Sequence, residues 1–299
     1  MFASNEPLCI FMEGALDNDA GKMGYGLMRF SKHPIVCVID SNYRGKTVQE
    51  AVELPYDIPV VGNIEEALAY NASILVLGIA PSGGRFPDTW DEPISIGLKH
   101  GLSLINGLHD DLNARFGHLL KGNIIWDVRK PKASYPIASG KAAELQNKRI
   151  LMVGTDMASG KMTAGLELYA ALLDKGFNTG FVPTGQIGNT FKDKDIIIIE
   201  GQGSFAHPGS TATLPLMRGS QPTHLILCHK AAYDHLRYPV SHIPIPPLDE
   251  FICLNEAMTS VCGSQTQAKT LGIALNTVGL SDEEAKQKVI ETENMTGLP

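Results

Sequence analysis

Short apolar runs of strand length alternate with helix-compatible stretches along most of the 299 residues. In the first half of the chain these runs lie at residues 7–12, 35–39, 74–79 and 102–105. Runs that are apolar throughout are typical of parallel strands whose two faces are both covered by helices. The pattern therefore predicts the α/β class. It places a Rossmann-like parallel sheet in this half, with Asn63 as the N-cap of one of its helices.

The same alternation restarts after a segment rich in Lys, Pro, Ser and Ala, which we interpret as a linker at residues 131–148. It separates a Rossmann-like domain at residues 1–130 from a P-loop NTPase-like α/β domain at residues 149–299. Strands of the second domain are expected at residues 149–153, 180–183, 195–200, 224–228, 251–254 and 271–276. Helices are expected at residues 161–175, closed by Gly176, and at residues 282–294, begun by Ser281.

One connection is too short for this topology. Seven residues, 189–195, separate Gly188 from the strand that begins at Ile196. A crossover between parallel strands needs about a dozen residues or more. Either these strands are antiparallel or not adjacent, or the chain lacks a segment near residues 188–191. We favour the missing segment.

The composition argues against several classes of protein. Twenty-five basic and 32 acidic residues leave a net charge of −7, which disfavours a protein that holds nucleic acid. No apolar run approaches the ~20 residues that span a bilayer, and no secretory signal is evident. The five cysteines contain no C-x-x-C pair. We expect a cytoplasmic protein with no nucleic-acid or membrane partner, and with reduced cysteines, of which Cys37, Cys228 and Cys253 lie in apolar runs.

The most specific chemical signal is the segment GTDMASGKMT at residues 154–163. It follows an apolar run and opens a helical stretch, which is where a phosphate-binding loop must lie. Small residues let backbone N–H groups approach phosphate oxygens, and a lysine adds positive charge. The residues expected to bind a phosphorylated cosubstrate are Gly154, Thr155, Asp156, Ser159, Gly160, Lys161, Met162 and Thr163. Because Met162 offers no hydroxyl to Mg²⁺, a metal would have to be reached by Thr163, about 100° further round the helix.

A carboxylate and a glycine-rich turn follow the four isoleucines at residues 196–199. Glu200 therefore lies at the carboxyl end of a strand, where open α/β sheets bind their ligands. Such a carboxylate can accept a proton or bind Mg²⁺. We predict catalytic roles for Glu200, Lys161 and the nearby His207, with His229 as a further acid–base candidate. Substrate contacts are expected from Thr184, Gly185, Gln186, Gly201, Gln202 and Gly203.

The first half contains a scrambled glycine motif, GKMGYG, at residues 21–26. Asp40 follows Gly21 by 19 residues, near the position of the acid that meets a ribose in dinucleotide-binding folds. The order of the glycines is wrong, however, and the preceding loop is long and acidic. A nicotinamide oxidoreductase would rest on Asp40 alone.

The motifs of the second half together resemble those of the dethiobiotin synthetases and related P-loop amidoligases, from which the chain departs at Val182 and Met162. A second resemblance covers nearly the whole chain. The loop at residues 154–163, the acidic strand end at residues 200–209 and the Rossmann-like first half are similar to a bacterial family long described as a domain of unknown function. That family is associated with D-glutamate N-acetyltransferase-like proteins, and its members have more residues before the acidic strand.

This resemblance implies an N-acetyltransferase that moves an acetyl group from acetyl-CoA to a small D-amino acid such as D-glutamate. The phosphate loop would hold the phosphates of CoA, and Glu200 or His207 would deprotonate the amine. One alternative is an ATP- and Mg²⁺-dependent ligase or kinase-like enzyme, with Thr163 and Glu200 on the metal. Another is a nucleotide-controlled binding module. We also expect a homo-oligomer, which is frequent among α/β enzymes of this size.

Overall fold

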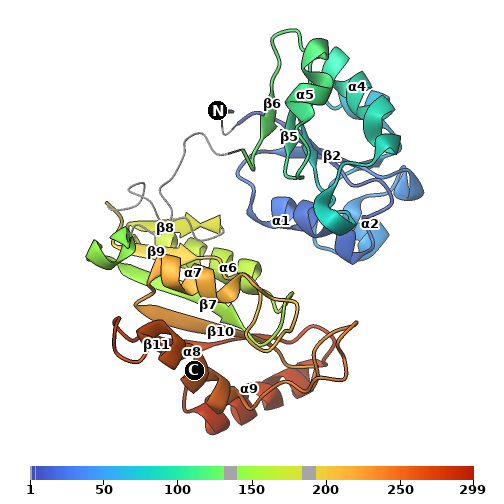
Figure 1. Ribbon diagram of the computed structural model, residues 1–299. Coiled ribbons are helices and arrows are strands. Elements are labelled where there is room, and N and C mark those ends of the chain that lie inside the picture. The colour runs from blue at the N-terminus through green and yellow to red at the C-terminus, as the bar shows by residue number, and fades with distance from the viewer. Residues whose placement is uncertain (1, 4, 131–139, 184–192) are drawn as a thin grey trace. The chain divides into compact units, whose positions relative to one another are not determined.

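The computed structural model describes residues 2–3, 5–130, 140–183 and 193–299 and divides into two compact units, Met1–Ser134 and Tyr135–Pro299 (Figure 1). Of the expected linker, residues 131–139 lie outside the described residues. Residues 140–148 contain a short 3₁₀ helix, Lys141–Glu144, and the first residue of a strand. The two units are described separately below.

The first unit contains a six-stranded sheet in which every described pairing is parallel, in the order β3-β2-β1-β4-β5-β6. This is the strand order of a doubly wound dinucleotide-binding fold. The strands are β1 (Leu8–Phe11), β2 (Ile35–Ile39), β3 (Val60–Val61), β4 (Ile74–Leu77), β5 (Ser103–Asn106) and β6 (Ile125–Asp127).

Helices cover both faces of this sheet, as the continuous apolar runs predict. Helices α1 (Lys22–Phe30) and α2 (Val48–Val52) pack with Leu8 and Ile10 of β1. The opposite face, with Cys9 and Phe11, packs against α3 (Ile64–Leu68), α4 (Asp91–Lys99) and α5 (Leu112–Phe116). The side chain of Asn63 accepts a hydrogen bond from the Glu66 N–H, which confirms it as the N-cap of α3.

Asp40 directly follows β2, but its carboxylate binds backbone groups of the protein itself. The residue is completely buried, and its Oδ2 accepts hydrogen bonds from the N–H groups of Ala15 (3.3 Å) and Leu16 (3.0 Å). Its Oδ1 accepts from the Asn42 N–H at 3.1 Å. The carboxylate thus fixes the loop that follows β1. The structure therefore gives no support to a dinucleotide site built on this acid.

Replacing Asp40 should destabilise the first unit. Asp40→Ala leaves three backbone N–H groups without their acceptor, and we expect it to lower the free energy of unfolding by about 3 kcal/mol. The protein's two tryptophans, Trp90 and Trp126, both lie in this unit, so urea unfolding followed by tryptophan fluorescence reports on it. The exposed Asp57→Ala is the control. Equal unfolding midpoints for the two variants would contradict the assigned role.

The second unit contains a five-stranded sheet in the order β11-β10-β7-β9-β8, again with every described pairing parallel. Its strands are β7 (Lys148–Gly154), β8 (Thr179–Val182), β9 (Ile196–Ile199), β10 (His224–Lys230) and β11 (Lys269–Asn276). Because β8 and β9 are adjacent and parallel, two of the three explanations for their short connection are wrong. The remaining explanation, a missing segment near residues 188–191, concerns a part of the chain that lies outside the described residues.

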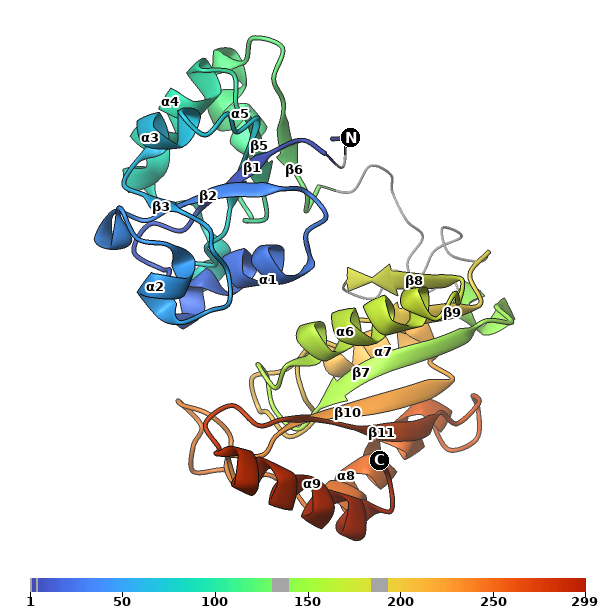
Figure 2. The ribbon, with the colours of Figure 1, turned by 180° about the vertical axis from the view of Figure 1, so that it is seen from behind.

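The second sheet also lies between helices (Figures 1 and 2). Helix α6 (Lys161–Asp174) packs on one face, and α7 (Thr213–Ser220) and α8 (Leu248–Ser260) pack on the other. Helix α9 (Asp282–Thr296) lies beside α8. Gly176, with a φ of 81°, follows the end of α6, and Ser281 caps α9, as expected.

The strand expected at residues 251–254 is wrong, because this segment lies within α8. Its short apolar run is one part of a helical pattern in which Leu248, Phe251, Ile252 and Asn255 are buried. That spacing follows one helix face. Because the segment is helical, Cys253 lies on the exposed side of α8. Cys37 and Cys228 are buried, as expected.

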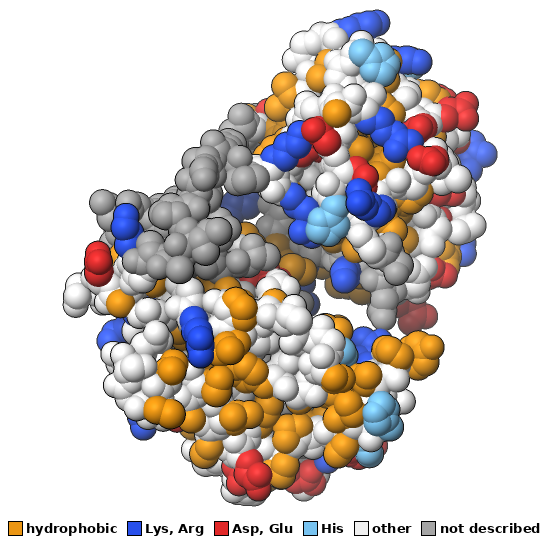
Figure 3. Space-filling view, in the orientation of Figure 1, with side chains coloured by type: hydrophobic (Ala, Val, Ile, Leu, Met, Phe, Trp, Pro, Cys, Tyr) orange, Lys and Arg blue, Asp and Glu red, His pale blue; other side chains and the backbone are white. Residues whose placement is uncertain are grey.

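Surface character differs between the visible faces of the two units. Charged side chains of both signs are frequent on the first, whereas hydrophobic side chains are more frequent on the second (Figure 3). Among the described residues, no helix has both the length and the apolar character needed to cross a bilayer.

Candidate functional site

Three strand ends in the second unit bring the predicted site residues together. Since the strands are parallel and ordered β10-β7-β9, their carboxyl ends lie along one edge of the sheet. The phosphate loop follows β7, Glu200 follows β9, and His229 lies near the end of β10. The site therefore forms at the sheet edge where ligands of α/β folds bind.

The turn from the loop into α6 is built for close approach to an anion. Gly160 adopts a φ of 98°, a conformation that favours glycine, and precedes the first residue of α6. No side chain caps the helix, and no acidic residue lies in its first turn. The first N–H groups of α6 and the positive end of its dipole are thus left for a ligand.

Lys161 is held inside the loop. Its side chain is 6% exposed, and its Nζ donates hydrogen bonds to the Asp156 carbonyl oxygen (2.8 Å) and the Ser159 Oγ (3.3 Å). Burial lowers the pKa of Lys161, while nearby groups, including Asp156 and Glu200, oppose that shift. A phosphate bound in the loop would give the Lys161 ammonium a charged acceptor in place of these two neutral oxygens.

Gly201 lies against this lysine, and the half-buried Glu200 is close enough for the two charges to interact. Burial raises the pKa of the Glu200 carboxyl, and the Lys161 charge opposes the shift. A methyl group on Gly201 would overlap with the Met152 carbonyl oxygen of β7 and press on the aliphatic stem of Lys161. The glycine therefore lets the end of β9 pass close to β7, which places the carboxylate beside the loop.

The turn after Glu200 is braced by its own side chains. The Thr213 Oγ1 donates to the Gln202 carbonyl oxygen at 2.9 Å. His207 is 9% exposed, and its Nδ1 accepts a hydrogen bond from the Gly209 N–H at 3.1 Å. Its neutral ring therefore carries the proton on Nε2. Nδ1 is occupied in holding the turn, so only Nε2 is left for contact with a substrate.

His229 is more closely connected to the phosphate loop than the sequence indicates. Its Nδ1 lies 3.0 Å from the Oγ1 of the fully buried Thr155. Burial lowers the pKa of this imidazole, and the Asp234 charge opposes the shift. A neutral His229 thus joins the end of β10 to the second residue of the loop.

The loop after β10 was missed by the sequence analysis. The Arg237 N–H donates to Asp156 Oδ2 at 3.0 Å, while Oδ1 of the same carboxylate accepts from the Met157 N–H at 2.6 Å. Asp156 thus joins two loops rather than facing solvent. Its place in the sequence could have indicated this loop. It directly follows a strand of the same parallel sheet, and the loops after such strands reach the same edge.

Some predicted residues are not brought to this site. Thr184, Gly185 and Gln186 lie outside the described residues. Met162 and Thr163 lie in the first turn of α6 and are both exposed. Within the described parts of the chain, no cluster of three or more His, Cys, Asp or Glu side chains is arranged to hold a metal ion. Metal binding by Thr163 and Glu200, expected only for an ATP- and Mg²⁺-dependent enzyme, stays a prediction.

A central parallel strand that leads through a glycine-rich loop to a lysine at a helix start defines a P-loop α/β domain. Here it accompanies a Rossmann-like domain. The chain belongs to the DUF1611 family. The family's model described as "Domain of unknown function (DUF1611_C) P-loop domain" matches residues 136–194 and 189–299. Its Rossmann-like counterpart, DUF1611_N, matches residues 41–131.

Similar proteins cover most of the chain. A crystal structure of a DUF1611 family protein from Anabaena variabilis has a TM-score of 0.90 and 41% identity, covering 99% of this chain and 94% of that one. A protein of Tritonibacter scottomollicae named D-glutamate N-acetyltransferase is 32% identical over 267 residues, which cover 79% of each chain. A protein of the same name from Pseudoalteromonas sp is 29% identical over 325 residues, covering 98% of this chain and 93% of the relative.

These comparisons also bear on the short connection before β9. The 325 aligned residues of the Pseudoalteromonas match exceed the 299 residues of this chain, so that relative contains residues with no counterpart here. The P-loop model matches in two pieces that overlap at residues 189–194. The missing segment near residues 188–191 stays a prediction.

Proposed function

We propose that this protein is an N-acetyltransferase that transfers the acetyl group of acetyl-CoA to the amine of a small D-amino acid such as D-glutamate. The observation that carries the proposal is the agreement between the two named relatives and a phosphate loop whose buried lysine interacts electrostatically with a half-buried carboxylate. In the proposed complex the loop and Lys161 hold the phosphates of CoA. Such a role requires no metal-binding hydroxyl after the lysine, which suits Met162.

In the proposed reaction Glu200 accepts a proton from the ammonium of the amino acid. The freed amine nitrogen attacks the thioester carbon, a C–N bond forms, and the C–S bond breaks. The sulfur leaves as the CoA thiolate, which takes up the second proton that the nitrogen loses as the amide forms, and the proton on Glu200 is released to solvent. Backbone N–H groups near the loop stabilise the oxyanion of the tetrahedral intermediate.

Glu200 suits the role of base better than His207. Burial raises the pKa of Glu200, which makes its carboxylate a stronger base than an exposed one. His207 uses Nδ1 to accept the Gly209 N–H and so helps to shape the turn after Glu200. We therefore propose Glu200 as the catalytic base and His207 as a positioning residue.

A direct assay tests the proposed function. Purified protein is incubated with acetyl-CoA and D-glutamate, and the released thiol and the N-acetyl product are both measured. L-glutamate serves as the matched acceptor control. The proposal expects both products with the D-isomer. If neither appears with any D-amino acid, and ATP with Mg²⁺ binds instead, the acetyltransferase proposal is overturned in favour of the ligase or the nucleotide-controlled binding module.

Removing the Lys161 charge should weaken cosubstrate binding. Lys161→Met keeps an apolar stem in the buried position but loses the ammonium, and we expect the Kd for acetyl-CoA to rise about 10- to 100-fold, the scale of a charge-assisted hydrogen bond. Isothermal titration calorimetry measures the change.

Lys175→Met is the control, since this exposed lysine follows the other end of α6. The Kd for acetyl-CoA should not change in the control. If Lys161→Met binds acetyl-CoA as tightly as the parent protein, the phosphates lie elsewhere.

A further inference from the structure

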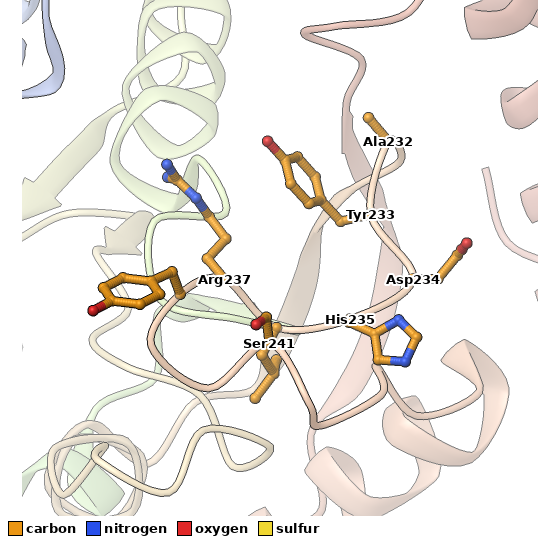
Figure 4. Close-up of a pocket in the computed structure, with 8 residues that line it drawn as sticks. Ala232, Tyr233, Asp234, His235, Arg237 and Ser241 are labelled. Carbon is orange, nitrogen blue, oxygen red and sulfur yellow. The ribbon is translucent and has the colours of Figure 1, made fainter.

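A cavity of about 430 Å³ lies in the second unit, within the loop that follows β10 (Figure 4). It is lined by residues between Ala232 and Ser241, which the reaction proposed above does not use. The cavity adjoins the phosphate loop directly, because the Arg237 N–H donates to Asp156 Oδ2 at 3.0 Å. A molecule bound by the phosphate loop can therefore extend into it.

Two side chains flank the open space in the close-up. Tyr233 and Arg237 extend toward the same side of the loop, while Asp234 and His235 point away (Figure 4). The residue Tyr233 is 39% exposed, and the Lys230 Nζ lies over its ring, 4.6 Å from the centroid. An aromatic ring and a guanidinium that face a common space are suited to bind a planar base. One face of the base can stack on the ring, and the guanidinium can stack on the other face.

The walls of the cavity are fixed by the fold. Ala231 N–H donates to the Asn276 carbonyl oxygen of β11 at 3.0 Å, so the start of the loop is held by the neighbouring strand. Further on, the Leu236 N–H donates to the Ile243 carbonyl oxygen at 2.9 Å, and the Leu236 side chain is 1% exposed. Tyr233 and Arg237 are thus presented from a loop with buried anchors, which lowers the entropic cost of ordering them around a ligand.

We propose that this cavity binds the nucleobase of the nucleotide whose phosphates lie on the loop at residues 154–161. The proposal rests on the proposed function, which makes that nucleotide the adenosine 3′,5′-bisphosphate end of acetyl-CoA. This proposal also specifies the orientation in which acetyl-CoA binds. In the order β10-β7-β9, the base lies at β10, the phosphates at β7, and the acetyl end reaches Glu200 after β9.

Titration calorimetry with two probes tests this subsite. Adenosine 3′,5′-bisphosphate carries base and phosphates, whereas inorganic pyrophosphate carries phosphates only. We expect Tyr233→Ala and Arg237→Ala each to raise the Kd for the bisphosphate about tenfold, the scale of one lost stacking partner, and to leave the Kd for pyrophosphate within twofold. Tyr233→Phe keeps the ring and should bind the bisphosphate within twofold of the parent protein. Tyr70→Ala removes a similarly exposed tyrosine (42%) in the first unit and serves as the control.

The outcomes separate this subsite from the proposed function. If Tyr233→Ala and Arg237→Ala bind the bisphosphate like the parent protein while Lys161→Met does not, the subsite is overturned and the phosphate loop stands. If the bisphosphate does not bind the parent protein, the subsite is overturned as well. If binding depends on Tyr233 but no amine is acetylated, the subsite is supported and the acetyltransferase proposal fails.

Discussion

Glu200→Gln should lower kcat for acetyl transfer by about 10²- to 10⁴-fold, the range that general-base catalysis contributes. The amide has nearly the shape of the carboxylate, so the packing between the end of β9 and Lys161 is kept. What is lost is the group that accepts the ammonium proton. We expect the Kd for acetyl-CoA to change little, because the phosphates are held by the loop rather than by Glu200. Steady-state kinetics together with calorimetry measure both quantities.

The pH profile gives this prediction a second readout. Only the ionised carboxylate can accept a proton, and burial raises the pKa of Glu200 above the ordinary value of 4.5. Activity should therefore fall as the pH drops through this raised pKa, and it should be retained above it. In Glu200→Gln the residual activity should lose this acidic limb.

Asp195→Asn is the matched control for Glu200→Gln. It makes the same kind of carboxylate-to-amide change at an exposed residue just before the opposite end of β9. Its kcat and pH profile should equal those of the parent protein. A Glu200→Gln enzyme with parental kcat would remove Glu200 from the mechanism.

Gly201→Ala should destabilise the second unit by more than about 4 kcal/mol, a size reached only when a core is severely disrupted. The added methyl group would overlap with the Met152 carbonyl oxygen, which belongs to the backbone of the central strand and cannot rotate away. Relief would require β9 to move away from β7, which breaks their parallel pairing. Gly201→Ala should also abolish acetyl-CoA binding, because the shift between β9 and β7 displaces the phosphate loop.

The two units allow this prediction to be localised. Both tryptophans lie in the first unit, so tryptophan fluorescence should report an unchanged urea transition, while circular dichroism should show an earlier one. Gly219→Ala is the control, because its added methyl group in α7 meets no atom within 4 Å. A helical glycine in open space should tolerate alanine or gain up to ~1 kcal/mol. Parental stability of Gly201→Ala would show that β9 and β7 lie further apart than described.

Local sequence patterns were sufficient for much of the architecture. The apolar runs predicted buried parallel strands, and Asn63 and Ser281 were identified as N-caps, because capping depends on residues within one helical turn. The phosphate loop was likewise predicted in place, since its glycines and lysine meet local demands of backbone geometry and charge. The family resemblance was confirmed by comparisons that cover nearly the whole chain.

Other properties depend on which segments meet in space. Asp40 has the sequence position of a ribose-binding acid, yet it is buried because the loop after β1 folds over it and donates its N–H groups. Residues 251–254 have a strand-like composition, but packing of a whole helical face against the sheet makes them part of α8. In both cases long-range burial overrides what a short window of sequence indicates.

The environment of the site also depends on which segments meet in space. The sequence by itself determined which chemical groups stand at the strand ends of the second unit. Only the tertiary structure decided that the buried Lys161 and the half-buried Glu200 lie close enough for their charges to interact, that the His229 Nδ1 lies within hydrogen-bond distance of the Thr155 Oγ1, and that Asp156 accepts a hydrogen bond from the Arg237 N–H. The physical reason is that burial and pairing depend on strand order, and the order β10-β7-β9 joins segments far apart along the chain.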